Sequence, residues 1–566
     1  MKKSFFMLFA LAQMTFASQL VDGKYVNFED YATGIKDYDN KNAVTLSDYK
    51  STYVNGTNST RHYVTNAMLQ KAFNAAKAQK AQGVFLPPGV WNFNDQIVVP
   101  HGMTLKGSYD RPHNVTNTDL NVTTNSNGDD VVSWNATHGT NIACFKGWNW
   151  SPAQYNPNAH DADACIALQG TATLDGVNVH YPQQAKPTTS SFSAIPYPWT
   201  ISCQTGTEIQ QISRCAVMNT TLVNSYAGID LSGTNDFYIK GVNMTALQMG
   251  MRLDYVTSQG AIEDVNIHTQ FSVNYYNIQG HLAGDPTSKK KYNKLEGYIE
   301  SNMTGIEFRW TDWEWLNNVF IYKANKGFYF KRSASTLVDR PLAAPDIQNS
   351  GCDQCVDAVY VEEGNTGIGI NFSNCNLLGG IVSGPNNYGT IRFTNSYLEF
   401  NAGKDKYFYK KKNGKNYYLK NHIEVGEHTT MQITNSEIVN FMGDVDPSTY
   451  EKKGLWLGST FNVNGNLLLS NSVIAWSEWG NGFNGVSYNG APIKETGTIG
   501  SYPKTEAYHF VYNDNSITLL DNILFRGTAL RPKDNGVIDN GVKSTTITSS
   551  NLLYDPLPTG YHRVVK

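Results

Sequence analysis

The sequence predicts an all-β chain folded as a parallel β-helix, in which each repeat forms one coil. Glycines that open short apolar strands recur 22 residues apart, at Gly228 and Gly250, Gly305 and Gly327, and Gly367 and Gly389. Each unit holds a few short strands broken by Gly, Asn or Ser, without a helical pattern. A period of about 20–25 residues built from strands is typical of a β-solenoid, whereas a propeller blade needs about forty residues.

Recurrent Asn-Ser and Asn-Cys steps predict stacked turns between the strands. They begin at Asn224, Asn374, Asn395, Asn435 and Asn471. Asn tolerates tight bends, and its amide can hydrogen-bond to the coil above. These steps therefore mark one corner of successive coils.

A helix is predicted at the N-terminal end of the stack, because a solenoid must cover its open end. Residues 65–82 are Ala-rich, and Thr65 or Asn66 can serve as the N-cap. The apolar positions follow helical spacing, at Met68, Leu69, Ala72, Phe73 and Ala76. Residues 83–108 then alternate short strands and turns.

This opening resembles a known group of folds. The helix is followed by "GVFLPPGVW" (83–91) and "IVVPHGMTLKG" (97–107), which is similar to the start of the pectate-lyase-like right-handed parallel β-helix proteins. That group includes pectate lyases, polygalacturonases, exported glucanases and phage tailspikes. The resemblance implies a right-handed solenoid but not a particular reaction, since function depends on the site.

The catalytic patterns of the best-known members are not met. Asp129-Asp130 precedes the main repeats, and Gly280-His281-Leu282 lacks the second Gly of the polygalacturonase G-H-G element. The R-x-P-x-x-R element of one pectate lyase family is absent as well. The exact family therefore stays open.

The N-terminus reads as a secretory signal. Lys2 and Lys3 precede an apolar run that is too short to span a membrane, and Ala17 suits a cleavage site. No later apolar run is long enough to span a bilayer. We expect a secreted protein, extracellular, periplasmic or on the cell surface. The expected organisation is a signal peptide (1–17), an N-terminal extension (18–61) and one β-helix domain (62–566), with insertions near 109–165, 276–300, 333–357 and 401–425.

Charge and cysteine content narrow the class of protein. The net charge of -3 gives no reason to expect a nucleic-acid partner. An oxidising compartment permits disulfides among the seven cysteines. Close neighbours could pair as Cys144–Cys165, Cys203–Cys215 and Cys352–Cys355, leaving Cys375, although spacing alone does not fix the connectivity.

Side-chain alternation predicts two outward rows of polar residues along the coils. Apolar pairs such as Ile229/Leu231 and Ile306/Phe308 must fill the interior, so the residues beside them face outward. The first row is Asp230, Arg252, Glu307, Tyr329 and Arg392, and the second is Ser232, Asp254, Arg309, Lys331 and Thr394. Whether Arg252 and Glu307 lie in adjacent coils is left open.

Four acids in and beside these rows are the candidate catalytic residues. They are Asp254, Glu307, Asp312 and Glu314. Coils about 4.8 Å apart and alternate residues about 6.6–7 Å apart place carboxylates about 5–10 Å from one another, the range that glycosidases use. If the segment after Trp310 is extended, Asp312 and Glu314 share one face.

Aromatic residues beside the acids suggest a carbohydrate, because sugar rings stack on flat aromatic faces. Three tryptophans, Trp310, Trp313 and Trp315, lie in residues 305–318. Of these, Trp315 is the one that we most expect in the core, because it stands at the head of an apolar strand. The candidate substrate-binding residues are Arg252, Arg309, Trp310, Trp313, Tyr329 and Lys331.

The sequence thus predicts an exported glycoside hydrolase acting on a polysaccharide, with no metal site and no cofactor. A polysaccharide lyase is the alternative enzyme. Arg309, Lys331 or Tyr329 would then supply the base, and calcium becomes a possible cofactor. A non-catalytic glycan-binding surface protein is the third hypothesis.

Overall fold

The structure is a computed structural model that describes most of the chain between residues 20 and 477. The described segments are 20–32, 64–113, 139–145, 164–204, 214–333, 343–364, 368–401, 422–441 and 461–477, with short strands at 53–54, 120–124, 130–134, 417–418, 455–456, 511–513, 517–526, 538–540 and 546–555. The predicted signal peptide and most of the predicted extension lie outside these segments.

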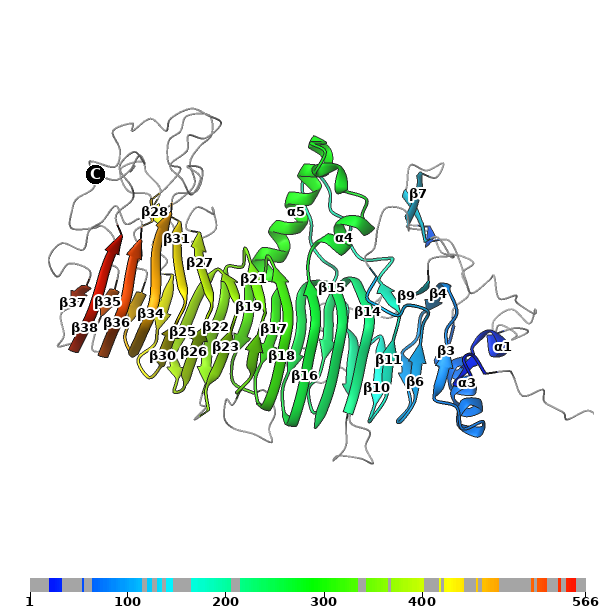
Figure 1. Cartoon of the computed structure of the whole chain (residues 1–566). Coiled ribbons are helices and arrows are strands. Elements are labelled where there is room, and N and C mark those ends of the chain that lie inside the picture. The colour runs from blue at the N-terminus through cyan, green and yellow to red at the C-terminus, as the bar shows by residue number, and fades with distance from the viewer. Residues whose placement is uncertain are drawn as a thin grey trace, which may run out of the picture.

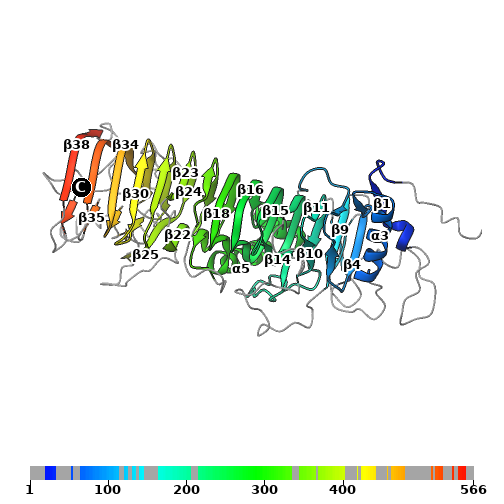
Figure 2. The ribbon, with the colours of Figure 1, turned by 90° about the horizontal axis from the view of Figure 1, so that it is seen from below.

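Parallel strands stack coil upon coil into one large sheet that winds along the molecule (Figures 1 and 2). The central coils comprise β13 (Trp199–Gln204), β14 (Arg214–Asp230), β15 (Asp236–Leu253), β16 (Val256–Ile267), β17 (Thr304–Phe308), β18 (Thr311–Tyr322), β19 (Lys326–Phe330), β20 (Asp346–Gln348), β21 (Gly351–Asp353) and β22 (Asp357–Gly364). The next coils comprise β23 (Ile370–Ser373), β24 (Asn376–Leu378), β25 (Gly380–Asn387), β26 (Thr390–Thr394), β27 (Tyr397–Asn401), β29 (Ile423–Val425), β30 (Thr430–Thr434), β31 (Glu437–Phe441), β33 (Phe461–Val463) and β34 (Asn466–Ser477). Each strand pairs with the equivalent strand one coil away.

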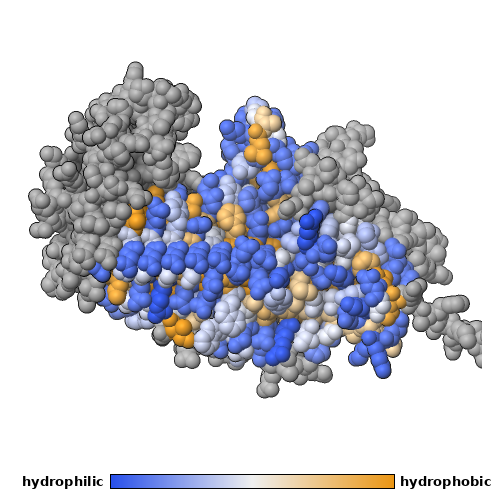
Figure 3. All heavy atoms as spheres, viewed as in Figure 1, coloured by the Kyte–Doolittle hydropathy of each residue, from blue (hydrophilic) through white to orange (hydrophobic). Residues whose placement is uncertain are grey.

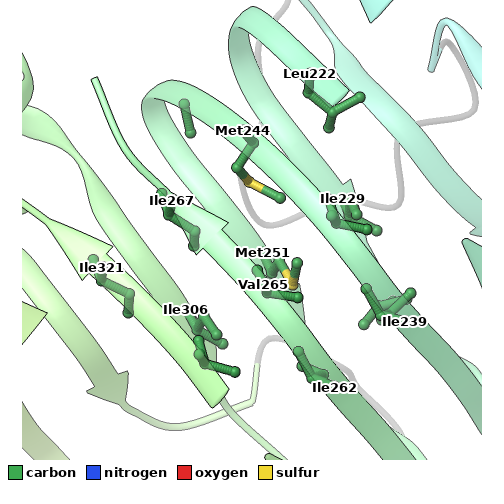
Figure 4. Packing of buried hydrophobic residues seen from close by; sticks show 14 of the residues in the cluster. Leu222, Ile229, Ile239, Met244, Met251, Ile262, Val265, Ile267, Ile306 and Ile321 are labelled. Atoms are coloured by element: carbon green, nitrogen blue, oxygen red, sulfur yellow. The ribbon is translucent and has the colours of Figure 1, made fainter. Parts of the chain in front are cut away.

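The interior is filled by columns of aliphatic side chains, one column from each wall of the solenoid. Figure 4 shows Ile229, Met251 and Ile306 in register, beside further columns from the other walls. These three side chains are fully buried. Because each contributes roughly 1.5–3 kcal/mol when removed from water, the repeated columns stabilise the stack.

The repeated glycines mark the closest contacts between coils. A Cβ at Gly228 would lie 2.4 Å from the Gly250 carbonyl oxygen, and one at Gly250 would lie 2.3 Å from that of Gly305. Real Cβ atoms do not approach oxygen so closely, because the backbones are packed at native density. The 22-residue glycine spacing therefore reports a steric requirement of the stack.

Gly250→Ala should accordingly destabilise the solenoid. Its new methyl group would also meet the Ile267 side chain at 2.9 Å, so we expect a loss of about 1–3 kcal/mol from overpacking. Urea unfolding measures this loss. The control is Gln259→Ala, because Gln259 is exposed on the neighbouring strand β16. Equal stability of the two variants would contradict the steric account.

The expected Asn turns are present at four of the five positions. Asn374, Asn395, Asn435 and Asn471 have φ between 49° and 55°, the left-handed region that Asn tolerates. The contact to the next coil comes from the residue after each Asn: Ser436 Oγ, for example, accepts a hydrogen bond from the Ser396 amide at 3.1 Å.

The fifth Asn has a different role. Asn224 lies within β14, where its Oδ1 accepts from the Tyr181 amide at 2.8 Å. Its prediction as a stacked turn is wrong.

Helix α3 (Asn66–Ala78) lies at the N-terminal end of the stack (Figure 1). Its five predicted apolar residues are buried. Thr65 is the N-cap and accepts a hydrogen bond from the Met68 amide at 3.3 Å, which satisfies one of the free donors at the helix start.

The insertion predicted near 276–300 is helical and begins earlier. It contains α4 (Gln270–Tyr275) and α5 (Pro286–Asn302), which project from the solenoid in Figure 1. Asp285 caps α5 by accepting from the Thr287 and Ser288 amides. Because β15 pairs directly with β17 across this insertion, the outward rows continue without a gap.

The other three predicted insertions lie partly outside the described segments. Within the 333–357 region, β20 and β21 belong to the regular coils. Among the helices that the structure describes, none is long and apolar enough to cross a membrane.

Two predicted disulfides form, Cys144–Cys165 and Cys203–Cys215. The third is wrong, since Cys352, Cys355 and Cys375 are free buried thiols. Cys352 Sγ lies 3.6 Å from the Ala358 carbonyl oxygen, and burial raises the pKa of this thiol well above its usual value. These cysteines serve as small apolar core residues.

Candidate functional site

The predicted first outward row is contiguous from Asp230 to Tyr329, but its last predicted member, Arg392, lies on the wall of β18. Asp230 pairs in register with Arg252, Arg252 with Glu307, and Glu307 with Tyr329. The expectation that this row is open to solvent is wrong, because its charged members are almost completely buried. Charged groups in this position require partners.

Arg252 is engaged with Asp230. Its Nη2 lies 2.8 Å from Asp230 Oδ2, and its Nε donates to Asp230 Oδ1 at 3.2 Å. The Trp199 ring lies 4.9 Å from the guanidinium carbon. This geometry assigns Arg252 a structural ion pair in place of the predicted substrate contact.

Arg309 joins two of the predicted catalytic acids. Its Nε donates to Glu307 Oε1 at 2.7 Å, and its Nη1 lies 3.4 Å from Asp254 Oδ2. Ser333 also donates to Asp254. One guanidinium thus contacts both carboxylates, and both side chains are almost completely buried. Glu307, Asp254 and Arg309 therefore form a buried ion network, and a catalytic role for the two acids stays a prediction.

The row continues one coil beyond Glu307 to Tyr329, which is buried but is surrounded by partly exposed polar side chains. Lys326 Nζ lies 3.8 Å from the Tyr329 ring centre and 4.2 Å from that of Tyr360, and Lys331 Nζ lies 5.6 Å from Tyr329. The Tyr329 hydroxyl donates to Glu362. Burial lowers the pKa of Lys326 and raises that of Tyr329. This group gathers amines, a phenol and a carboxylate on one surface.

The sequence reading missed Lys326, Tyr360 and Glu362 in this group. Tyr360 sits in register with Tyr329, but 31 residues separate them in the sequence, more than the 22-residue period. Lys326 could have been found from its position directly before the repeated Gly327, at the start of β19 (Lys326–Phe330).

Strand β18 presents two tryptophans on its outward surface. Trp313 and Trp315 are 44% and 41% exposed, and Leu316, next along the strand, faces the core. Trp315 was expected to be the buried tryptophan, and that expectation is wrong. From Trp313 to Leu316 the strand pairs in regular register, so alternation from the buried Leu316 directs Trp315 outward.

Asp312 and Glu314 do not share a face. Asp312 is exposed, whereas Glu314 is fully buried and pairs in register with Gly260. A Cβ at Gly260 would overlap the Phe237 ring, so the Glu314 carboxyl lies on the core side of the coil near an aromatic side chain. The prediction of one common face is therefore wrong.

The pKa of Glu314 is raised to about 8. Burial is the main cause, and the Asp312 charge adds to it; the Thr311 hydroxyl and the Asp312 amide oppose the shift. Neither carboxyl oxygen makes a hydrogen bond of ordinary geometry within the described part of the chain. At neutral pH the group is therefore mostly protonated.

Trp310 is half-buried rather than a free platform. Its ring packs on Tyr255 with centroids 5.4 Å apart, and its Nε1 is buried. Trp313 is thus the predicted aromatic contact that the structure exposes, and Trp315 is a second, unpredicted one.

Among the described residues, no group of three or more His, Cys, Asp or Glu side chains is placed to hold a metal ion. The lyase alternative, with its possible calcium, is not decided by this observation.

Comparisons with known proteins give only distant matches. No family model matches the chain, and no curated protein matches it. Among solved structures, the A-module of the mannuronan C-5 epimerase AlgE6 of Azotobacter vinelandii matches at 9% identity and a TM-score of 0.32, covering 94% of this chain and 100% of that one. A mutant tailspike protein of E. coli bacteriophage HK620, solved with a hexasaccharide, matches at 9% identity and a TM-score of 0.39, covering 94% and 80%.

A third match is PfbA, a surface adhesin of Streptococcus pneumoniae, at 10% identity and a TM-score of 0.25, covering 94% and 92%. TM-scores this low do not establish the fold, which is assigned from the strand pairing. They also give no information about the reaction. The coil-by-coil parallel register through the described strands supports the same conclusion as the N-terminal sequence pattern. The chain folds as a parallel β-helix, and its resemblance to the pectate-lyase-like proteins rests on the sequence pattern at residues 83–107.

Proposed function

We propose that the protein is an exported carbohydrate-active protein that holds a polysaccharide against the outward surface of β18. The observation that carries this proposal is the pair of exposed tryptophans, Trp313 and Trp315. Large apolar rings are left in water on a soluble surface mainly where they bind something, and flat aromatic faces suit the C–H faces of sugar rings. Two disulfides fit an oxidising compartment.

Glycoside hydrolysis is the proposed activity. Glu314, with a pKa of about 8, has the protonation state that a glycosidase acid needs, and the exposed Asp312 lies two residues away as base or nucleophile. The Glu314 side chain lies on the core side of β18. The reaction therefore requires this part of β18 to move so that the carboxyl group reaches the bound substrate. Asp254 and Glu307 have no part in the proposed reaction.

A polysaccharide lyase is the second candidate, favoured by the group around Tyr329. Lyase chemistry needs a base and a cation that neutralises a uronate carboxylate. Lys326, with its lowered pKa, and Lys331 supply such groups beside a phenol. This site lies on β19, away from the tryptophans of β18.

A panel of polysaccharides, scored for new reducing ends and for ultraviolet absorbance, separates these functions. A hydrolase produces reducing ends without absorbance, and a lyase produces unsaturated ends that absorb. We expect reducing ends alone. An absorbing product would favour the lyase site, and the absence of both products, together with retention of the protein on a polymer, would reduce the proposal to glycan binding.

Replacing the exposed tryptophans should weaken binding without unfolding the protein. Trp313→Ala and Trp315→Ala should each raise the dissociation constant for a bound polysaccharide by roughly threefold to tenfold, the size expected for one lost stacking contact. Phe320→Ala is the matched control, because Phe320 is also exposed on β18 (36%) but lies beyond the turn at Asn318. Weakening by all three variants alike would argue against a tryptophan site.

A further inference from the structure

A polar row continues from Trp315 along the axis of the solenoid. Trp315 is in register with Asp346, and the row then runs through Asn371, Arg392 and Gln432. Residues on either side of this row, such as Phe372 and Phe393, are fully buried, so the row itself faces outward. Successive coils are about 4.8 Å apart, and the row therefore extends about 19 Å beyond the tryptophan.

Hydrogen bonds between neighbouring coils hold this row in place. Asn371 Nδ2 donates to Asp346 Oδ1 at 2.7 Å, and Arg392 Nη1 donates to Asn371 Oδ1 at 3.1 Å. Arg392 Nε donates to Gln432 Oε1 at 3.2 Å. All four side chains remain partly exposed. The row is thus a pre-ordered set of donors and acceptors that remains available to a ligand.

A parallel row beside it is uncharged. Its members follow one another in register through β18, β20, β23, β26 and β30: Asn317, Gln348, Ser373, Thr394 and Thr434. Together the two rows carry one carboxylate, Asp346, and one guanidinium, Arg392, over these five coils. Figure 3 shows that a hydrophilic band runs from coil to coil along one face of the molecule.

Charges on the other side of the tryptophans are already paired. Lys240 lies 3.0 Å from Glu263, and Arg214 lies 2.6 Å from Asp236. Asp312, exposed beside Trp313, adds a negative charge. A polyanionic chain would meet these carboxylates and would find few cations free to neutralise it.

We propose that this surface binds an uncharged polysaccharide, laid along the solenoid axis with one sugar on Trp313 or Trp315 and the following sugars over the Asn371–Gln432 part of the row. Amides and hydroxyls both donate and accept hydrogen bonds, as sugar hydroxyls do. The inference rests on the proposed function and names its substrate class. It differs from the acidic polymers that a likeness to pectate lyases and polygalacturonases would suggest.

Affinity electrophoresis of the full chain tests the substrate class. The gels contain either uncharged polymers (a mixed-linkage β-glucan, a galactomannan, a glucuronate-free xylan) or acidic ones (polygalacturonate, alginate). We expect retardation by at least one uncharged polymer, unchanged between about 0.05 and 0.5 M salt, because screening affects only charge–charge attraction. Retardation by acidic polymers alone would overturn the inference while leaving the proposed function standing. Retardation or cleavage of none would overturn the proposed function.

Variants locate the polymer on the row. Gln432→Ala, four coils from Trp315, should weaken retardation by the uncharged polymer roughly twofold to fivefold, the loss of about one hydrogen bond. The control is Lys290→Ala, an exposed residue of helix α5, outside both rows. Equal retardation of Gln432→Ala and wild type would show that the polysaccharide does not extend along the solenoid axis as far as Gln432, and would overturn this part of the inference. Trp313→Ala tests the aromatic end of the surface separately. Circular dichroism checks that each variant is folded.

Discussion

Glu314→Gln should make the protein more stable than wild type at high pH. The wild-type protein loses stability as the pH rises, and the variant should not show this loss. The folded-state pKa of Glu314 is about 8, against a usual value of 4.5. The folded state therefore binds the proton more tightly than the unfolded state, and its advantage is complete below about pH 4.5 and is lost as the pH rises toward 8 and beyond. A shift of this size corresponds to roughly 2–5 kcal/mol. The Gln side chain keeps the shape and cannot ionise.

The measurement is urea unfolding of both proteins at pH 5 and at pH 9. The Gln variant and wild type should be similarly stable at pH 5, and the variant should be the more stable at pH 9. Comparing the two proteins cancels the other titrating groups. Asp312→Asn is the control, because its side chain is exposed. Parallel stability curves for wild type and Glu314→Gln would show that the carboxyl does not sit in the core as described.

Arg252→Ala should be among the most destabilising substitutions in the chain. Asp230 is fully buried and Arg252 is 2% exposed, so removal of the guanidinium leaves a buried carboxylate without its principal cation. The expected loss is about 3–5 kcal/mol. Urea unfolding at neutral pH, followed by tryptophan fluorescence, measures it.

The double variant Asp230→Asn/Arg252→Met separates charge from packing. Removing both charges together should recover much of the loss, because no uncompensated charge is then left buried. The same comparison decides between a structural and a substrate-binding role. If Arg252→Ala folds with wild-type stability and loses only affinity for a polysaccharide, the structural assignment of this pair is wrong.

The fold was predictable because each coil repeats the same physical constraints. The Gly228–Gly250 spacing reflects a contact between a glycine Cα and the next coil's carbonyl oxygen, which tolerates no side chain. Alternation along short strands likewise identified the core columns at Ile229 and Ile306. Local rules of this kind act within one strand or between adjacent coils, and a single sequence displays them.

The site was less predictable, because burial on the outside of a solenoid depends on what covers it. Alternation correctly directed Arg252 and Glu307 away from the core, but it could not show that other parts of the protein bury them. The register shift beside Trp313 had a similar effect. The irregular step separates the environments of Asp312 and Glu314, which a regular strand would place on one face.

The polar row from Asp346 to Gln432 was outside the reach of sequence reading for another reason. Only Arg392 of its members was placed in an outward row, and it was assigned to the row of Glu307. The structure places Arg392 on the wall of β18, in register with Asn371. Aligning coils by their glycines matched Gly389 to Gly305, although these residues precede strands of different walls.

Footprinting of the tryptophans in the presence of a bound polysaccharide tests the central claim most directly. The full chain is exposed to hydroxyl radicals with and without the polymer that it binds or cleaves, and oxidation is measured by peptide mass spectrometry. We predict that the polymer protects Trp313 and Trp315, while Phe320 and Tyr388, which are also exposed, are oxidised as before. Unchanged oxidation of both tryptophans while the polymer is bound would place the polysaccharide elsewhere and contradict the account.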